Sequence, residues 1–127
     1  MKHEEITNLI IKAFYKVYNT LGYGFLEKVY ENAMRIELLE MGLFVEQQKR
    51  INVYYLSQMV GDYYADLEIN ELVIVELKAH EAIIEEHENQ LINYLKATEI
   101  EVGLLLNFGK KPEVKRKVFD NNRKLML

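Results

Sequence analysis

The first forty residues carry apolar side chains at helical spacing in two separate runs. The first run forms one broad apolar face and predicts a helix from about His3 to Thr20. Leu21-Gly22-Tyr23-Gly24 interrupts the pattern, because glycine is conformationally permissive and weakens a helix interior. The second run predicts a helix from near Phe25, and Gly42 stands where a helix C-terminal cap is expected. The two segments predict an N-terminal helical hairpin.

The middle of the chain changes to short runs of β-branched and aromatic residues, which are typical of strands. The first predicted strand is Ile51–Leu56, and the residues from Ser57 to Gly61 are expected to form the turn after it. Tyr63–Ile69 and Leu72–Ala79 supply two more strands, and a turn at Asn70-Glu71 joins them as a hairpin. These segments predict a three-stranded meander.

The last third of the chain returns to helical spacing and then to one apolar run. A helix is predicted from about Ala82 to Thr98, followed by a buried strand at Val102–Phe108. A strand that is reached through a helical crossover usually lies parallel to the strand before it. Val114–Asn121 is compatible with a final strand or a short helix. The order of elements predicts an α/β fold with a mixed sheet flanked by helices, in one domain of residues 1–127.

Charged residues interrupt the third strand of the predicted meander. Glu76 and Lys78 follow an apolar stretch and share one face of the strand, because side chains alternate. Asp66 stands near the end of the preceding strand. A charge on a mostly apolar strand costs several kcal/mol unless it is paired or binds a metal. The predicted hairpin therefore brings two carboxylates and an ammonium group to one edge of the sheet.

These residues have the composition of a site for a hard cation. Asp66 and Glu76 offer oxygen ligands that suit Mg²⁺ or Mn²⁺, and the main-chain carbonyl of Leu77 lies between them. Lys78 is placed to orient a water molecule or to stabilise charge on a phosphate. The alternatives are a Glu76–Lys78 ion pair at an exposed strand end, or a structural cluster in an unrelated α/β domain.

Two pairs of residues on the predicted helices extend the candidate site. Gln90 and Tyr94 are four residues apart and share one face of the helix after the third strand. Glu27 and Tyr30 are one turn apart at the start of the second helix. The alternatives are a solvated Gln90 beside a core tyrosine, and a glutamate that only favours the helix dipole.

Composition narrows the classes of partner. The 127 residues include no cysteine, which excludes disulfides and thiolate metal sites and fits a cytoplasmic protein. No segment has the pattern of a signal peptide or a membrane span. The net charge of −4 excludes binding of nucleic acid by bulk electrostatics. Basic residues gather after Gly109, where they form either a local phosphate-binding surface or a solvated segment.

The motifs resemble those of a known family. Gly24, Glu27 and Tyr30 spell GxxExxY, and the chain also contains the segments DLEINELVIVELKA, NQLINYLKA and GLLLNFG. Over most of its length the chain thus resembles the GxxExxY protein family, which looks like a compact branch of the PD-(D/E)XK nuclease superfamily. The resemblance implies a restriction-endonuclease-like core of helix, three strands, helix and strand, which is the order that the pattern predicts.

The resemblance also implies roles for individual residues. Asp66 and Glu76 correspond to the metal-binding carboxylates, and Lys78 corresponds to the catalytic lysine. Glu27 matches the acidic residue that the first core helix often supplies to the metal site. The QxxxY motif of exonuclease-like branches, which contacts nucleic acid or supports the site, is matched by Gln90 and Tyr94.

The resulting hypothesis is a metal-dependent, nuclease-like phosphodiesterase that acts on DNA or, alternatively, RNA. Mg²⁺ or Mn²⁺ is the expected cofactor, bound by Asp66 and Glu76 and by the Leu77 carbonyl, with Tyr30 among the supporting residues. The alternative hypothesis is a non-catalytic module that binds nucleic acid or protein and retains the nuclease fold. A homodimer is a further expectation from the small size of the chain.

Overall fold

The computed structural model describes residues 1–125 and has an α/β fold with one mixed sheet. The last two residues of the predicted domain, 126 and 127, lie outside the described part. The elements are α1 (Glu4–Leu21), α2 (Glu27–Glu40), β1 (Val45–Tyr55), β2 (Gln58–Ile69), β3 (Val73–Lys78), α3 (Glu85–Lys96), β4 (Val102–Phe108), β5 (Pro112–Val118) and the 3₁₀ helix η1 (Asn121–Arg123). The predicted fold class is confirmed, including the N-terminal helical hairpin.

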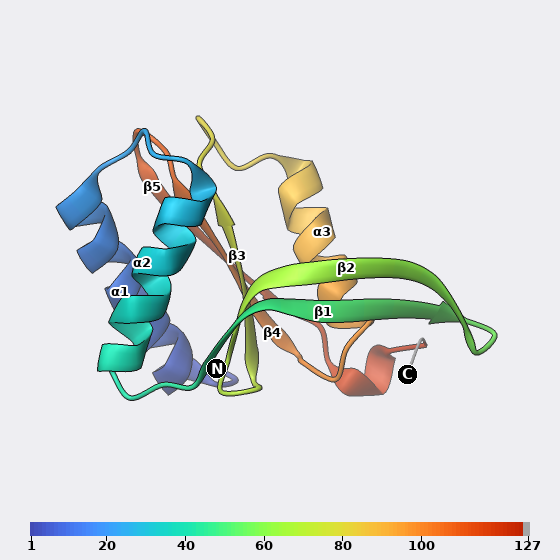
Figure 1. Cartoon of the computed structure of the whole chain (residues 1–127). Coiled ribbons are helices and arrows are strands. Elements are labelled where there is room, and N and C mark those ends of the chain that lie inside the picture. The colour runs from blue at the N-terminus through green and yellow to red at the C-terminus, as the bar shows by residue number, and fades with distance from the viewer. Residues whose placement is uncertain (126–127) are drawn as a thin grey trace.

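The five strands lie in the order β1-β2-β3-β4-β5. All neighbouring strands are antiparallel except β3 and β4, which are parallel because α3 connects them as a crossover. The α1–α2 hairpin covers one face of the sheet and α3 covers the other (Figure 1). Strands β3 and β4 lie in the middle and are buried almost throughout, so they form the rigid centre of the molecule.

Two apolar clusters hold these layers together. The larger cluster joins the apolar faces of α1 and α2 to the sheet, and the smaller one joins α3 to the opposite face. Ile10, Phe14 and Val17 contribute the α1 stripe at the spacing that the sequence pattern predicts. Within residues 1–125, no helix has both the length and the apolar character needed to cross a bilayer.

The structure corrects several predicted boundaries. Strand β1 begins six residues before Ile51, because its polar first half lies at the sheet edge, where polar side chains are tolerated. The hairpin turn is the dipeptide Leu56-Ser57 rather than Ser57–Gly61, and both residues have positive φ. Helix α3 begins at Glu85, three residues later than expected. The segment left open after Pro112 is a strand, β5.

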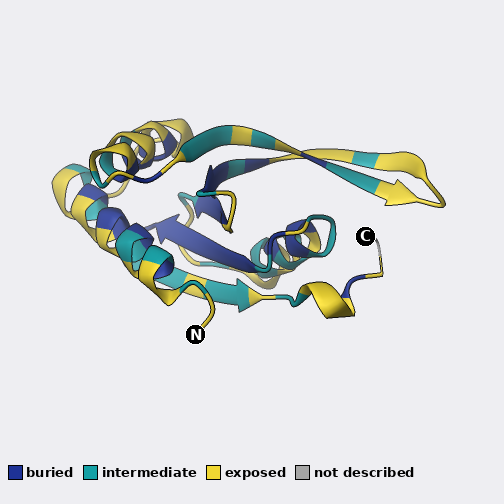
Figure 2. Cartoon of the chain, turned by 90° about the horizontal axis from the view of Figure 1, so that it is seen from below, coloured by how far each residue is buried: buried dark blue, intermediate teal, exposed yellow. Residues whose placement is uncertain are grey.

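The β1–β2 hairpin changes from one face of the sheet to the other along its length. Leu67 and Ile69 pack in the cluster with α1 and α2, whereas Ala65 and Ile51 pack in the cluster with α3. The change occurs beside Gln48, whose φ of 52° is left-handed and interrupts the regular alternation of β1. Beyond this point the hairpin extends as a long arm with an exposed tip (Figure 2).

Tyr30 fixes the loop that joins α1 to α2. Its ring is fully buried and stacks on Phe108, with the ring centroids 4.1 Å apart. Its hydroxyl donates a hydrogen bond to the Gly22 carbonyl at 2.7 Å and accepts one from the Phe25 N–H at 3.2 Å. The side chain therefore holds the backbone that leads into α2.

We expect Tyr30→Phe to lower the free energy of unfolding by about 1–2 kcal/mol, because it leaves two backbone groups without their partner. Denaturant titration measures the change. The matched control is Tyr15→Phe on α1, since Tyr15 is partly exposed and its hydroxyl makes no hydrogen bond within residues 1–125. Equal stability of the two variants would contradict this role for the Tyr30 hydroxyl.

Candidate functional site

Strands β2 and β3 separate at one point, and two carboxylates fill the place of the missing backbone hydrogen bonds. Their pairing runs from Ile69↔Val73 to Leu67↔Val75 and then ends. Glu76 Oε2 accepts a hydrogen bond from the Asp66 N–H at 2.8 Å, and Asp66 Oδ2 accepts one from the Leu77 N–H at 2.8 Å. We call this place the fork. The structure thus brings Asp66 and Glu76 together at the fork.

The Glu76 carboxylate is buried, and the Asp66 carboxylate beside it is half-buried. Glu76 is only 6% exposed. Burial and the neighbouring charge of Asp66 raise the pKa of Glu76 well above its ordinary value. Burial also raises the pKa of Asp66, although the hydrogen bond from the Leu77 N–H acts in the opposite direction. Without a compensating cation, the pair therefore holds its negative charge at a free-energy cost.

Lys78 lies on the same face of β3 as Glu76, two residues further along. Its positive charge partly offsets the rise in the pKa of both fork carboxylates. Within residues 1–125 its ammonium group forms no salt bridge, so the predicted alternative of a Glu76–Lys78 ion pair is not formed. Asn107 fixes the backbone just beyond Lys78 through two 3.0 Å hydrogen bonds with the N–H and C=O of His80.

The Leu77 carbonyl has the orientation that a ligand at the fork requires. The N–H of Leu77 points to Asp66 across the fork. In an extended strand the N–H and C=O of one residue point to the same side, so the carbonyl oxygen also faces the fork. The Leu77 side chain lies on the opposite face of β3 from Glu76 and Lys78, in the cluster under α1 and α2.

Gln90 and Tyr94 approach the fork from α3. Gln90 Nε2 donates a 2.7 Å hydrogen bond to the Tyr94 hydroxyl, as their helical spacing predicts. Burial and the charge of Glu76 raise the pKa of Tyr94 to about 12. The phenol is therefore neutral at ordinary pH, and because it already accepts from Gln90, its own proton is available to an acceptor.

The structure does not bring Glu27 and Tyr30 to the fork. The Glu27 side chain is about half exposed and faces His80 Nε2 at 3.6 Å. Tyr30 lies in the core beneath α2, where it holds the loop before this helix. Tyr30 therefore shapes the entry into α2, whereas the Glu27 carboxylate faces His80. The carboxylate that lies toward Asp66 comes from another residue of α2.

Glu31 is the residue that the sequence prediction missed. It is 4% exposed and accepts hydrogen bonds from Gln47 and Gln48 at 2.7 and 2.8 Å, and from Lys28 at 2.9 Å. Gln48 Nε2 also lies 3.4 Å from Asp66 Oδ1, and thus links the Glu31 carboxylate to the fork. The signal in the sequence was the spacing, because Glu31 shares the buried face of α2 with Met34 and Leu38.

The donor set at the fork fits a hard divalent cation that keeps part of its water shell. No group of three or more His, Cys, Asp or Glu side chains within residues 1–125 is arranged to hold a metal ion. Mg²⁺ binds in many proteins through only one or two carboxylates, together with waters and substrate phosphates. Asp66 and Glu76 supply such a pair, and no described residue donates a hydrogen bond to Glu76 Oε1.

Most basic residues after Gly109 are used elsewhere. Lys117 pairs with Glu88 at 2.7 Å, and the Lys124 ammonium donates to the carbonyls of Thr98 and Ile100. They lie on or beyond β5, at the opposite sheet edge from β1. Lys110 and Lys111 differ, because they are exposed in the turn after β4, at the same end of the parallel β3–β4 pair as Lys78.

Known proteins resemble the chain at the level of superfamily and fold. A model of the PD-(D/E)XK nuclease superfamily matches residues 4–117. No curated protein matches the chain. The solved structure of SSO0001 is similar with a TM-score of 0.56 and 14% sequence identity, over 73% of this chain and 50% of that one. The chain thus spans about half the length of SSO0001, and the likeness is one of fold. The narrower GxxExxY family stays a prediction.

We expect the raised pKa values to appear in the pH dependence of stability. Because the pKa of Glu76 is higher in the folded than in the unfolded protein, the protonated carboxyl stabilises the folded state at low pH. This stabilisation is lost as the pH rises from about 4.5 through the pKa of Glu76 in the folded state. In the absence of divalent metal, Glu76→Gln should prevent this loss of stability, because the glutamine amide stays neutral. The variant should exceed the wild type in unfolding free energy by about 1–2 kcal/mol at pH 8 and by less at pH 5.

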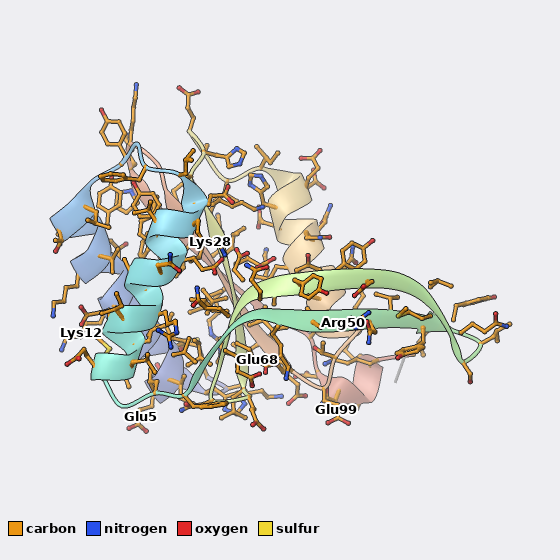
Figure 3. The ribbon with its side chains drawn as sticks, in the orientation of Figure 1. Glu5, Lys12, Lys28, Arg50, Glu68 and Glu99 are labelled. Atoms are coloured by element: carbon orange, nitrogen blue, oxygen red, sulfur yellow. The ribbon has the colours of Figure 1, made fainter. Side chains whose placement is uncertain are left out.

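Denaturant titrations across this pH range in EDTA measure the difference. The control is Glu99→Gln, which makes the same chemical change at an exposed carboxylate after α3 (Figure 3). Parallel stability curves for wild type and Glu76→Gln would contradict the raised pKa.

Proposed function

Because the chain belongs to the PD-(D/E)XK nuclease superfamily, we propose that it is a metal-dependent nuclease that hydrolyses phosphodiester bonds at the fork. DNA is the proposed substrate, with RNA as the alternative. The observation that carries the proposal is the pair of hydrogen bonds that holds the half-buried Asp66 beside the buried Glu76. A divalent cation offsets such a concentration of negative charge, whereas among residues 1–125 Lys78 is the cationic group that acts on both carboxylates.

Each residue at the fork has a task in this proposal. Asp66 and Glu76 hold Mg²⁺ or Mn²⁺, and the Leu77 carbonyl adds a third oxygen. When bound, the cation supplies Lewis-acid chemistry that makes water a better nucleophile at neutral pH. Lys78 is free of carboxylate partners among the described residues, so its ammonium group can orient that water or donate to the scissile phosphate.

Residues around the fork orient the substrate. Tyr94 accepts from Gln90 and can donate its proton to a phosphate oxygen or to Glu76. Lys110 and Lys111 offer exposed positive charge at the same end of the β3–β4 pair as Lys78, and contribute attraction to the phosphate backbone despite the acidic balance of the chain.

A second candidate is the non-catalytic module. It is favoured by the lack of a group of three potential metal-ligating side chains in the described residues. Calorimetric titration with Mn²⁺ separates the two functions. The nuclease requires binding that is lost in Glu76→Gln, whereas the module predicts no binding that depends on this carboxylate.

We expect Lys78→Ala and Glu76→Ala each to lower cleavage by about 100-fold or more, because each removes a group that acts on the developing charge or holds the cation. Labelled single- and double-stranded DNA and RNA with Mg²⁺ or Mn²⁺ provide the assay. Lys12→Ala, an exposed change on α1 (Figure 3), is the matched control. Equal cleavage by wild type and both fork variants would contradict the assignment.

We also expect Glu31→Gln to lower cleavage by about tenfold or more, since groups that support metal ligands contribute to this extent. Glu27→Gln, four residues earlier on the same helix, should have the smaller effect because its carboxylate is exposed. Rates of both variants are compared at saturating Mn²⁺ and over a Mn²⁺ titration. The reverse ranking would show that the family motif, rather than Glu31, provides the helix carboxylate.

A further inference from the structure

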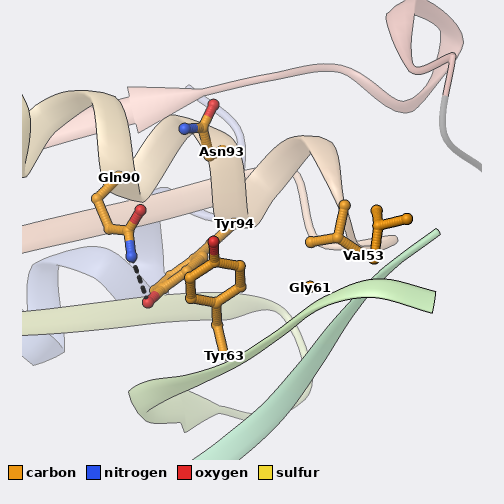
Figure 4. Close-up of a pocket in the computed structure, with 7 residues that line it drawn as sticks. Val53, Gly61, Tyr63, Gln90, Asn93 and Tyr94 are labelled. Carbon is orange, nitrogen blue, oxygen red and sulfur yellow. Dashed lines mark hydrogen bonds between the residues drawn. The ribbon is translucent and has the colours of Figure 1, made fainter. Parts of the chain in front are cut away.

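A cavity of about 260 Å³ lies between the β1–β2 arm and α3. Figure 4 shows Tyr63 on the arm beside Tyr94 and Gln90 on the helix, and Gly61 and Asn93 also line the cavity. The remaining lining residues are Val53 and Val60. The cavity adjoins the fork, because Tyr94 lines the cavity and also lies near enough to Glu76 for that charge to raise the pKa of Tyr94.

The lining has the chemistry of a site for a flat, neutral ring. None of the seven lining residues is charged, which disfavours a phosphate or a carboxylate as the occupant. Tyr63 is 44% exposed, and its ring is tilted by 49° from the Tyr94 ring, so the two rings do not stack on each other. A face of Tyr63 therefore remains available for stacking.

Polar groups at the cavity can recognise the edge of such a ring. Gln90 uses its Nε2 on the Tyr94 hydroxyl, which leaves its Oε1 as an acceptor. The Asn93 amide is exposed on α3 and offers both a donor and an acceptor. An apolar wall, one aromatic face and a few amide groups are the usual composition of a pocket for a small ring system.

Gly61 keeps this space open. Its φ lies outside the left-handed region, so the backbone does not require glycine here. A Cβ atom at this position would approach Tyr63 Cε2 to 3.0 Å and Val53 Cβ to 3.3 Å. A larger residue would thus press on the Tyr63 ring and on Val53, both of which line the cavity.

We propose that this cavity binds one unpaired nucleobase of a single-stranded nucleic acid whose backbone passes the fork. The inference rests on the proposed function and adds the substrate class to it. A base within a duplex cannot enter, because both of its faces and its pairing edge are already covered. The substrate is therefore a single strand or a frayed end, held by stacking on Tyr63 and by amide contacts from α3.

Binding without cleavage tests the proposal. A short fluorescein-labelled oligothymidylate is compared by fluorescence anisotropy with the same strand carrying abasic sites, and with a blunt duplex, all in EDTA. The wild type should bind the base-containing strand at least about fivefold more tightly than the abasic strand, since stacking of one base contributes at least this much. The duplex should bind no better than the abasic strand.

Three variants locate the effect. Tyr63→Leu should abolish the preference for the base-containing strand, whereas Tyr63→Phe should retain it because the ring is preserved. Gly61→Ala should weaken the preference by narrowing the cavity. No preference in the wild type, or a preference that persists in both Tyr63→Leu and Gly61→Ala, would overturn the proposal.

The same samples keep the two proposals separate. Glu76→Gln should retain the base preference in EDTA and lose cleavage when Mn²⁺ is added. If cleavage persists in this variant, the proposed function fails while the binding result stands. If the base preference is absent but cleavage depends on Glu76, only the nucleobase pocket is refuted.

Discussion

The architecture depends on two hydrogen bonds at the fork, in which side-chain carboxylates take the place of backbone carbonyls as acceptors. A sheet that splits leaves buried N–H groups without partners, and each such group costs about 1–3 kcal/mol. Here the Asp66 and Leu77 N–H groups are satisfied by Glu76 and Asp66. The strands can therefore diverge while these two N–H groups keep acceptors, and the same bonds hold a buried carboxylate next to a half-buried one. One arrangement provides both the opening in the sheet and the groups that line it.

Access to the fork from both sides follows from the change of face in the β1–β2 hairpin. A regular hairpin would keep all its buried side chains against one helical layer. The left-handed backbone of Gln48 turns the arm, so that its base lies with α1 and α2 and its outer part lies with α3. Glu31 of α2 consequently interacts with Asp66, and Tyr94 of α3 interacts with Glu76 and Asp66, although the two helices lie in separate layers. Beyond the part that packs on α3, many side chains of the arm are exposed.

Local patterns predicted the fold because helical and strand periodicity depend on neighbouring residues. The pairing of Gln90 with Tyr94 follows from helical spacing alone, and the convergence of the two strand carboxylates follows from the short turn between β2 and β3. Which of Glu27 and Glu31 faces the sheet depends on how α2 packs, and the spacing of a single motif does not encode this. The polar start of β1 was missed for a similar reason, since an edge strand is recognised only once the strand order is known. The superfamily was identified, while the substrate and the metal are proposals.

The topology also decides when during folding the fork forms. The β1–β2 hairpin pairs residues that are close in sequence, whereas β3 meets β4 only after the α3 crossover has closed a longer loop. The hydrogen bonds of the fork join β2 to β3 across a short turn, whereas the burial of Glu76 also requires β4 and α3 to pack beside it. We therefore expect Glu76 to be buried late on the folding pathway. Interactions absent from the transition state change the unfolding rate more than the folding rate. The mutual repulsion of the two carboxylates therefore raises the unfolding rate and shortens the lifetime of the native state. A cation that binds both carboxylates would lower the unfolding rate.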